Sequence, residues 1–120
     1  MRCGMIRTKR VYEKAAKEDG FRVLIDRLWP RGLTKEKAAA DLWMKEIAPS
    51  DALRKAFHQE TVNWAGFEKR YFTELAKKKD LLAEIRKLER EHGTVTLLYG
   101  RKDEKENQAV VLARALKGQK

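Results

Sequence analysis

VLIDRLWPRG, the stretch Val23–Gly32, decides the fold of this chain. Its first three residues are apolar, which is typical of a strand covered on both faces of a sheet, and we expect that strand over Phe21–Arg27. The polar and turn-forming residues that follow predict the loop that leaves it. Ligands of open α/β sheets bind outside the carboxyl ends of the strands. Asp26, Arg27 and Arg31 are therefore expected at a ligand site.

Two further stretches predict strands. Thr94–Tyr99 is β-branched and apolar, and Ile6–Tyr12 is a short segment that carries a lysine and two arginines. The charges in Ile6–Tyr12 favour an edge position, because charged side chains discourage pairing between molecules. Its connection to the next strand is short for a parallel crossover, so the sequence leaves its direction open.

Apolar residues at helical spacing predict about five helices. We expect them over Lys35–Ile47 after a Thr34 cap, over a short segment from Ser50 through Phe57, over Val62–Lys78, from an Asp80 cap to Gly93, and over Glu104–Lys117. Together these elements predict one α/β domain over residues 1–120. It is a small, three-layer-like domain with a short, mainly parallel sheet of about three strands.

Basic residues outnumber acidic residues in this chain. Lys and Arg number 28 against 18 Asp and Glu, which gives a net charge of +10. Such an excess favours anionic partners, either small phosphates or nucleic acid, and it is equally typical of a surface that only keeps a protein in solution. The sequence does not choose between these interpretations.

Other features of the composition concern location. No apolar run approaches the length of a membrane span, and the N-terminus lacks the apolar core of a signal peptide. The single cysteine, Cys3, has no sequence-evident base beside it and is interpreted as inert. One cysteine allows no disulfide within the chain, which is typical of a reducing cytoplasm. We therefore expect a cytoplasmic protein without membrane contact.

Arginines follow two of the predicted strands. Arg27 and Arg31 lie after the strand that begins at Phe21, and Arg101 follows Tyr99. If the strands are parallel neighbours, these three guanidinium groups converge and can bind a phosphate or carboxylate in a bidentate manner. The alternative is that they pair with nearby aspartates and only brace the loops.

Three residues are candidates for catalysis: Asp26, His58 and Tyr99. They would orient the anion or move protons in a hydrolysis or group transfer. His58 lies in a predicted loop, and the favoured interpretation is an ordinary surface histidine or one that binds a neighbouring carbonyl oxygen. Asp103 stands three residues before Glu106, a spacing that indicates a capping box at a helix start rather than a catalytic acid.

Cofactor motifs are absent from the sequence. It contains no glycine-rich dinucleotide or phosphate-binding loop. Two separated histidines and a terminal cysteine do not form a zinc-type cluster. We therefore predict neither a metal nor a cofactor.

Several segments together resemble the YeaO-like proteins, a family of small bacterial and archaeal proteins. The similar segments are Arg22–Gly32, Ile47–Ser50, Phe57–His58, Trp64–Leu75, Val95–Tyr99 and Asp103–Leu112. The resemblance spans nearly the whole chain and implies a compact α/β domain with a small, mainly parallel sheet. It implies no activity.

The resemblance also bears on the site. Arg70 and Asn107 fall within the similar segments and join Arg27, Arg31 and Arg101 as candidate ligand-binding residues. Similar proteins tend to carry a histidine just before the asparagine, where this chain has Glu106. That departure weakens any histidine-based mechanism in the last loop.

Three hypotheses of function follow. The first is a protein that binds an anionic small molecule at the strand ends, with or without hydrolase or transferase chemistry. The second is a basic nucleic-acid-binding module, whose affinity would fall steeply with salt. The third is a structural or regulatory interaction domain without a ligand, in which the strand-end arginines are all paired internally.

Overall fold

The computed structural model describes residues 4–118, so Cys3 lies outside the described residues. Its centre is a four-stranded sheet in the order β1-β4-β2-β3, with every neighbouring pair parallel. The strands are β1 (Met5–Arg10), β2 (Phe21–Leu24), β3 (Leu42–Trp43) and β4 (Thr94–Tyr99). The predicted α/β class with a parallel sheet is confirmed, and β1 is an edge strand that runs parallel to β4.

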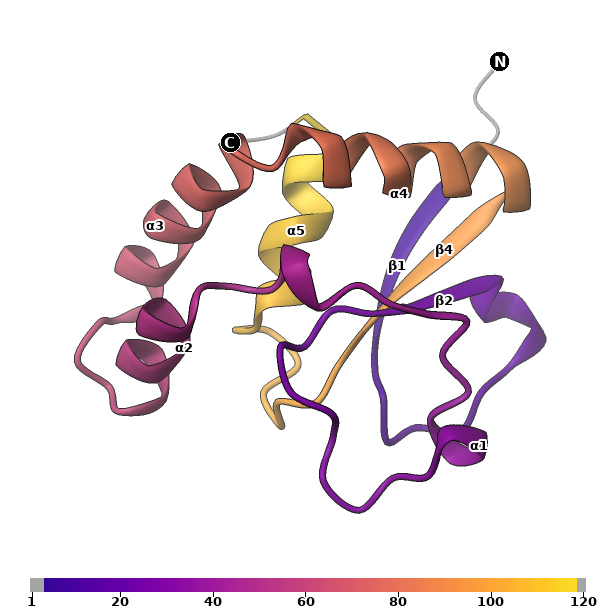
Figure 1. Cartoon of the computed structure of the whole chain (residues 1–120), viewed down its shortest axis with the longest axis horizontal. Coiled ribbons are helices and arrows are strands. Elements are labelled where there is room, and N and C mark those ends of the chain that lie inside the picture. Colours follow the sequence, from indigo (N-terminus) through magenta and orange to yellow (C-terminus); the bar gives the residue numbers. More distant parts are fainter. Residues whose placement is uncertain (1–3, 119–120) are drawn as a thin grey trace.

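Five α-helices surround the sheet (Figure 1). They are α1 (Lys35–Ala38), α2 (Asp51–His58), α3 (Trp64–Ala76), α4 (Lys79–His92) and α5 (Gln108–Leu116), and two short 3₁₀ helices, η1 (Lys17–Asp19) and η2 (Lys45–Ile47), lie between them. Figure 1 shows α4 across the amino ends of β1 and β4, whereas α2 lies toward the opposite end of the sheet. The carboxyl edge is therefore left to loops and α2.

Two apolar clusters cover the two faces of the sheet. Val23 and Ile25 belong to the larger cluster with residues of α2 to α5, and Leu24 belongs to a smaller one with Ala38 of α1. All three residues of the VLI run are fully buried. Because successive side chains of a strand point to opposite faces, this arrangement confirms a strand covered on both faces.

The predicted helix over Lys35–Ile47 is wrong. The Thr34 side chain does accept from the Lys37 N–H, but α1 ends at Ala38 because Ala39 adopts the left-handed conformation, with φ of 48°. The buried guanidinium of Arg22 binds the carbonyl oxygens of Ala38 and Ala39, which a continuing helix would need for itself. Tertiary contacts therefore override the helical spacing of the apolar residues.

The chain beyond Ala39 forms the fourth strand, which the sequence did not predict. The Asp41 carboxylate accepts from the Arg22 N–H, and the Asp41 N–H donates to the Arg22 carbonyl oxygen. Leu42 and Trp43 then pair with β2 as β3. The apolar residues that look like one helical face thus belong to an edge strand and η2.

Several boundaries also differ from the prediction. β2 ends at Leu24 rather than Arg27, and α4 begins at Lys79 without a side-chain cap, so Asp80 is not its cap. The helix over Glu104–Lys117 begins only at Gln108, because the cap is Asn107, whose side chain accepts from the Val110 N–H. Asp103 instead binds the N–H groups of Lys105 and Glu106 in the preceding turn.

Candidate functional site

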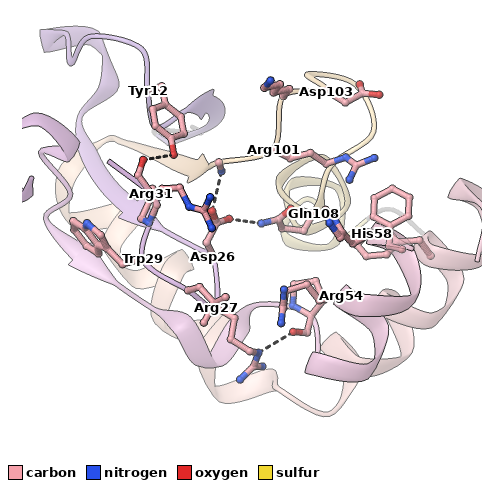
Figure 2. Close-up of a pocket in the computed structure, with 17 residues that line it drawn as sticks. Tyr12, Asp26, Arg27, Trp29, Arg31, Arg54, His58, Arg101, Asp103 and Gln108 are labelled. Atoms are coloured by element: carbon pink, nitrogen blue, oxygen red, sulfur yellow. Dashed lines mark hydrogen bonds between the residues drawn. The ribbon is translucent and has the colours of Figure 1, made fainter. Parts of the chain in front are cut away.

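A cavity of about 600 Å³ lies at the carboxyl edge of the sheet. It is enclosed by the segments after β1, β2 and β4, by α2, and by the first turn of α5 (Figure 2). This is the position at which open α/β sheets bind ligands. Among the predicted site residues, those that line it are Asp26, Arg27, Arg31, His58 and Arg101.

Asp26 links three elements at the cavity wall. Its carboxylate accepts a hydrogen bond of 2.9 Å from the Gly100 N–H, after β4, and another from the Gln108 side-chain amide, on α5. A Cβ added at Gly100 would lie 2.8 Å from the Asp26 Oδ2, so any larger residue there would displace the carboxylate. Burial raises the pKa of Asp26 to about 6, although both hydrogen bonds act to lower it.

Arg27 braces the cavity rather than pointing freely into it. Its guanidinium donates to the carbonyl oxygens of Pro49 at 3.0 Å and Ala48 at 3.3 Å. Tyr71 of α3 donates to the neighbouring Ile47 carbonyl oxygen at 2.7 Å, and Lys78 also binds Ala48. The segment between η2 and α2 is therefore held firmly as one wall of the cavity.

At the α2 side of the cavity, cationic side chains lie close to aromatic rings. Arg101 lies over the ring of Phe57, 4.1 Å from its centroid, and Phe57 stacks on Phe67. Arg54 and His58 are four residues apart on α2, so they share one face of the helix. Three buried guanidinium Nε groups in residues 4–118 lack a hydrogen-bond partner, and two of them belong to Arg54 and Arg101.

The rim of the cavity is more exposed. The Arg31 carbonyl oxygen accepts a 2.8 Å hydrogen bond from the Tyr12 hydroxyl, while the residue itself lies at the surface. Asp103 is also exposed, and its backbone hydrogen bonds hold its pKa below the ordinary value. In Figure 2 these residues lie toward the upper side of the opening.

Three predicted site residues lie elsewhere. Tyr99 is buried in the larger apolar cluster, and its burial raises the pKa of its hydroxyl. Asn107 is fully buried and serves as the cap of α5. Arg70 is exposed on α3 and does not line the cavity. None of the three is placed to touch a molecule in the cavity.

Arg54 and Gln108 are among the polar residues that line the cavity although the sequence did not indicate them as site residues. Arg54 sits one helical turn before His58, and that spacing is its only signal in the sequence. Gln108 had no separate signal, because the predicted helix began four residues too early. His58, expected in a loop, is the last residue of α2.

The described part of the chain contains neither a cluster of metal-ligating side chains nor a helix that could span a membrane. Within residues 4–118 no three His, Cys, Asp or Glu side chains gather as a metal site would require. No helix in the same range combines the length and apolar character needed to cross a membrane.

The fold and the cavity define a small α/β domain with a basic pocket at the carboxyl edge of a parallel sheet. The chain belongs to the DUF488-N3i family, described as the inactive DUF488-N3 subclade, whose family model matches residues 5–120. No solved structure matches the chain.

Curated relatives place the chain in the YeaO-like group that its segments resemble. It is 49% identical over 111 residues to the uncharacterized protein YeaO of Escherichia coli K12, covering 90% of this chain and 93% of that protein. It is 38% identical over 113 residues to the uncharacterized protein Rv3073c of Mycobacterium tuberculosis H37Rv, covering 94% of each. The resemblance deduced from the sequence is thereby confirmed.

Proposed function

We propose that this protein binds an anionic small molecule in the cavity at the carboxyl edge of its sheet. The observation that carries the proposal is the set of cavity-lining arginines, of which Arg54 and Arg101 each have a buried Nε group without a partner. Buried donors in folded proteins normally have a hydrogen-bond partner. An anion between these side chains would supply one.

Internal pairing accounts for only part of the cationic wall. Arg27 is occupied by backbone carbonyl oxygens, which supports the bracing alternative for that residue. Arg54 donates to Asp51, but it does so through a single Nη at 3.2 Å near the surface. Arg101 lies over an aromatic ring and forms no salt bridge with a carboxylate of residues 4–118. These two arginines are therefore assigned to the ligand.

Binding without turnover is the simpler form of this proposal. The matching subclade is described as inactive. Tyr99, one of three catalytic candidates, is buried away from the cavity, and Asp26 already accepts two hydrogen bonds from the protein. These placements favour a receptor-like or sequestering role over hydrolysis or group transfer.

The test is titration calorimetry with phenyl phosphate and benzoate at 150 mM salt. Arg54→Gln and Arg101→Gln are each expected to weaken binding by about tenfold or more, because each removes a charge-assisted hydrogen bond. Arg90→Gln is the matched control, since Arg90 is exposed in the last turn of α4, near the amino ends of the strands. Equal losses in all three variants would refute a specific site.

Nucleic-acid binding is the second candidate, and the net charge of +10 favours it. It predicts that a short RNA binds with an affinity that falls steeply between 50 and 200 mM salt, following counterion release. It also predicts that Arg90→Gln weakens RNA binding as much as Arg54→Gln. A cavity ligand would instead discriminate strongly between the two variants.

A further inference from the structure

We propose that the cavity selects an organic phosphate monoester whose opposite end carries hydrogen-bond donors on a ring, as in a phosphorylated sugar or a nucleotide. This inference rests on the proposed function, because it assigns a ligand class to the same site. It follows from the size of the cavity, the separation of its charges and the residues between them.

The size of the cavity indicates an organic ligand. Pockets that bind organic small molecules typically enclose about 300–1,000 Å³, and this cavity encloses about 600 Å³. An inorganic anion would leave most of that space unfilled. The ligand therefore includes a body larger than its anionic group.

The cationic end of the cavity lies on α2. Arg54 and His58 share a helix face, and Arg101 lies over Phe57 beside them. Two guanidinium groups match a phosphate with two negative charges better than a carboxylate with one, and the imidazole can donate a further hydrogen bond. A phosphate monoester is mostly doubly charged above about pH 6, which is its second pKa.

The opposite wall carries the carboxylate of Asp26. Figure 2 shows Asp26 joined to Gln108, with His58 on the far side of Gln108 and Arg54 below it. The Asp26 carboxylate would repel a phosphate beside it. Hydroxyl or amino groups of a ligand could instead donate hydrogen bonds to the remaining lone pairs of its oxygens. The carboxylate thus fixes the orientation of the ligand, with its phosphate toward α2 and its donors toward β2.

Flat and apolar side chains also line the cavity. Phe57 and Phe67, which stack on each other, contribute from α2 and α3, and Trp29 and Pro30 contribute from the loop after β2. Such surfaces pack well against the face of a ring and offer it few polar partners. A sugar or a base therefore fits between the phosphate and the donors better than an extended chain does.

The experiment compares four probes by titration calorimetry at pH 7.5 and 150 mM salt. Phenyl phosphate carries the anion and a ring without donors, ribose 5-phosphate and adenosine 5′-monophosphate carry the anion and donors, and ribose carries donors alone. We expect at least one donor-bearing phosphate to bind about tenfold or more tightly than phenyl phosphate, through hydrogen bonds to a charged acceptor. Whichever of the two binds more tightly identifies the sugar or the base as the recognised ring. Ribose is expected not to bind measurably.

Asp26→Asn is the decisive variant. It removes the charge, and its side-chain amide can still serve Gly100 and a rotated Gln108 amide. The advantage of the donor-bearing phosphate over phenyl phosphate is expected to shrink by about tenfold, while phenyl phosphate binds equally or more tightly once the negative charge is gone.

The outcomes separate the two proposals. If phenyl phosphate binds in an Arg54-dependent manner but both donor-bearing phosphates bind no better, the ligand class is wrong and the anion site stands. An advantage that survives unchanged in Asp26→Asn also overturns the ligand class. If benzoate binds but no phosphate does, the ligand class is wrong, and if neither benzoate nor any phosphate binds, the proposed function itself fails.

Discussion

At the scale of single residues, burial of the Asp26 carboxyl group makes the stability of the fold depend on pH. Its raised pKa means that the folded protein binds more protons than the unfolded chain between about pH 4 and pH 6. The free energy of unfolding therefore falls as the pH rises through that window. At about 1.4 kcal/mol per pKa unit, the charged carboxylate costs at most about 3 kcal/mol above pH 6.

Asp26→Asn should remove this cost while keeping the two hydrogen bonds. We expect the variant to be more stable than the parent protein at pH 7.5, with the advantage shrinking as the pH falls to 4. Urea unfolding of both proteins across that pH range measures the difference in their free energies of unfolding. The contributions of the other carboxylates are the same in both proteins and cancel in this difference. Asp26→Ala, which loses both hydrogen bonds, should instead be destabilised at every pH. If the asparagine variant is less stable than the parent at pH 7.5, the expected stabilisation is wrong.

At the scale of elements, the break between α1 and β3 depends on the left-handed conformation of Ala39. The left-handed conformation costs a residue with a Cβ about 1 kcal/mol or more in free energy, whereas glycine adopts it without this cost. Ala39→Gly is therefore expected to raise the free energy of unfolding by up to about 1 kcal/mol, after the entropy that glycine loses on folding. Chemical denaturation is the measurement.

Ala40→Gly provides the matched control for this element. Ala40 is partly buried and does not have a positive φ, so glycine there should lower stability by about 0.5–1 kcal/mol. If Ala39→Gly stabilises the protein and Ala40→Gly destabilises it, the left-handed turn at Ala39 is confirmed. A destabilisation of similar size at both positions would instead support a helix that continues through Ala39.

At the scale of the whole molecule, the cavity depends on how α3 holds the segment before α2. The buried hydroxyl of Tyr71 donates to the Ile47 carbonyl oxygen, and burial raises the pKa of that hydroxyl so that it remains protonated. Tyr71→Phe leaves the carbonyl oxygen without this donor and should cost about 1–3 kcal/mol in urea unfolding.

Tyr12→Phe is the counterpart at the rim of the cavity. Its exposed hydroxyl also donates to a carbonyl oxygen, that of Arg31, but water can replace it there. We expect a loss below about 0.5 kcal/mol. Similar losses in the two variants would show that the Ile47 carbonyl oxygen is not buried in solution as it is in the structure.

Local patterns in the sequence determined much of this protein. The VLI run and Thr94–Tyr99 predicted the two central strands, because β-branched and apolar runs specify buried strands without help from distant residues. Ser50 and Gly93 correctly marked a helix start and a helix end, since caps act on backbone groups within one turn. Parallel strands ending in polar loops also predicted the edge at which the cavity lies.

Tertiary structure alone decided the rest. β3 replaced the second half of a predicted helix because the buried Arg22 guanidinium binds the last carbonyl oxygens of α1. Arg54 and Gln108 line the cavity because α2 and α5 pack beside the sheet. Tyr99 is buried in the core instead of lining the cavity. Each of these outcomes depends on residues far apart in the chain, so spacing along the sequence carries no signal of them.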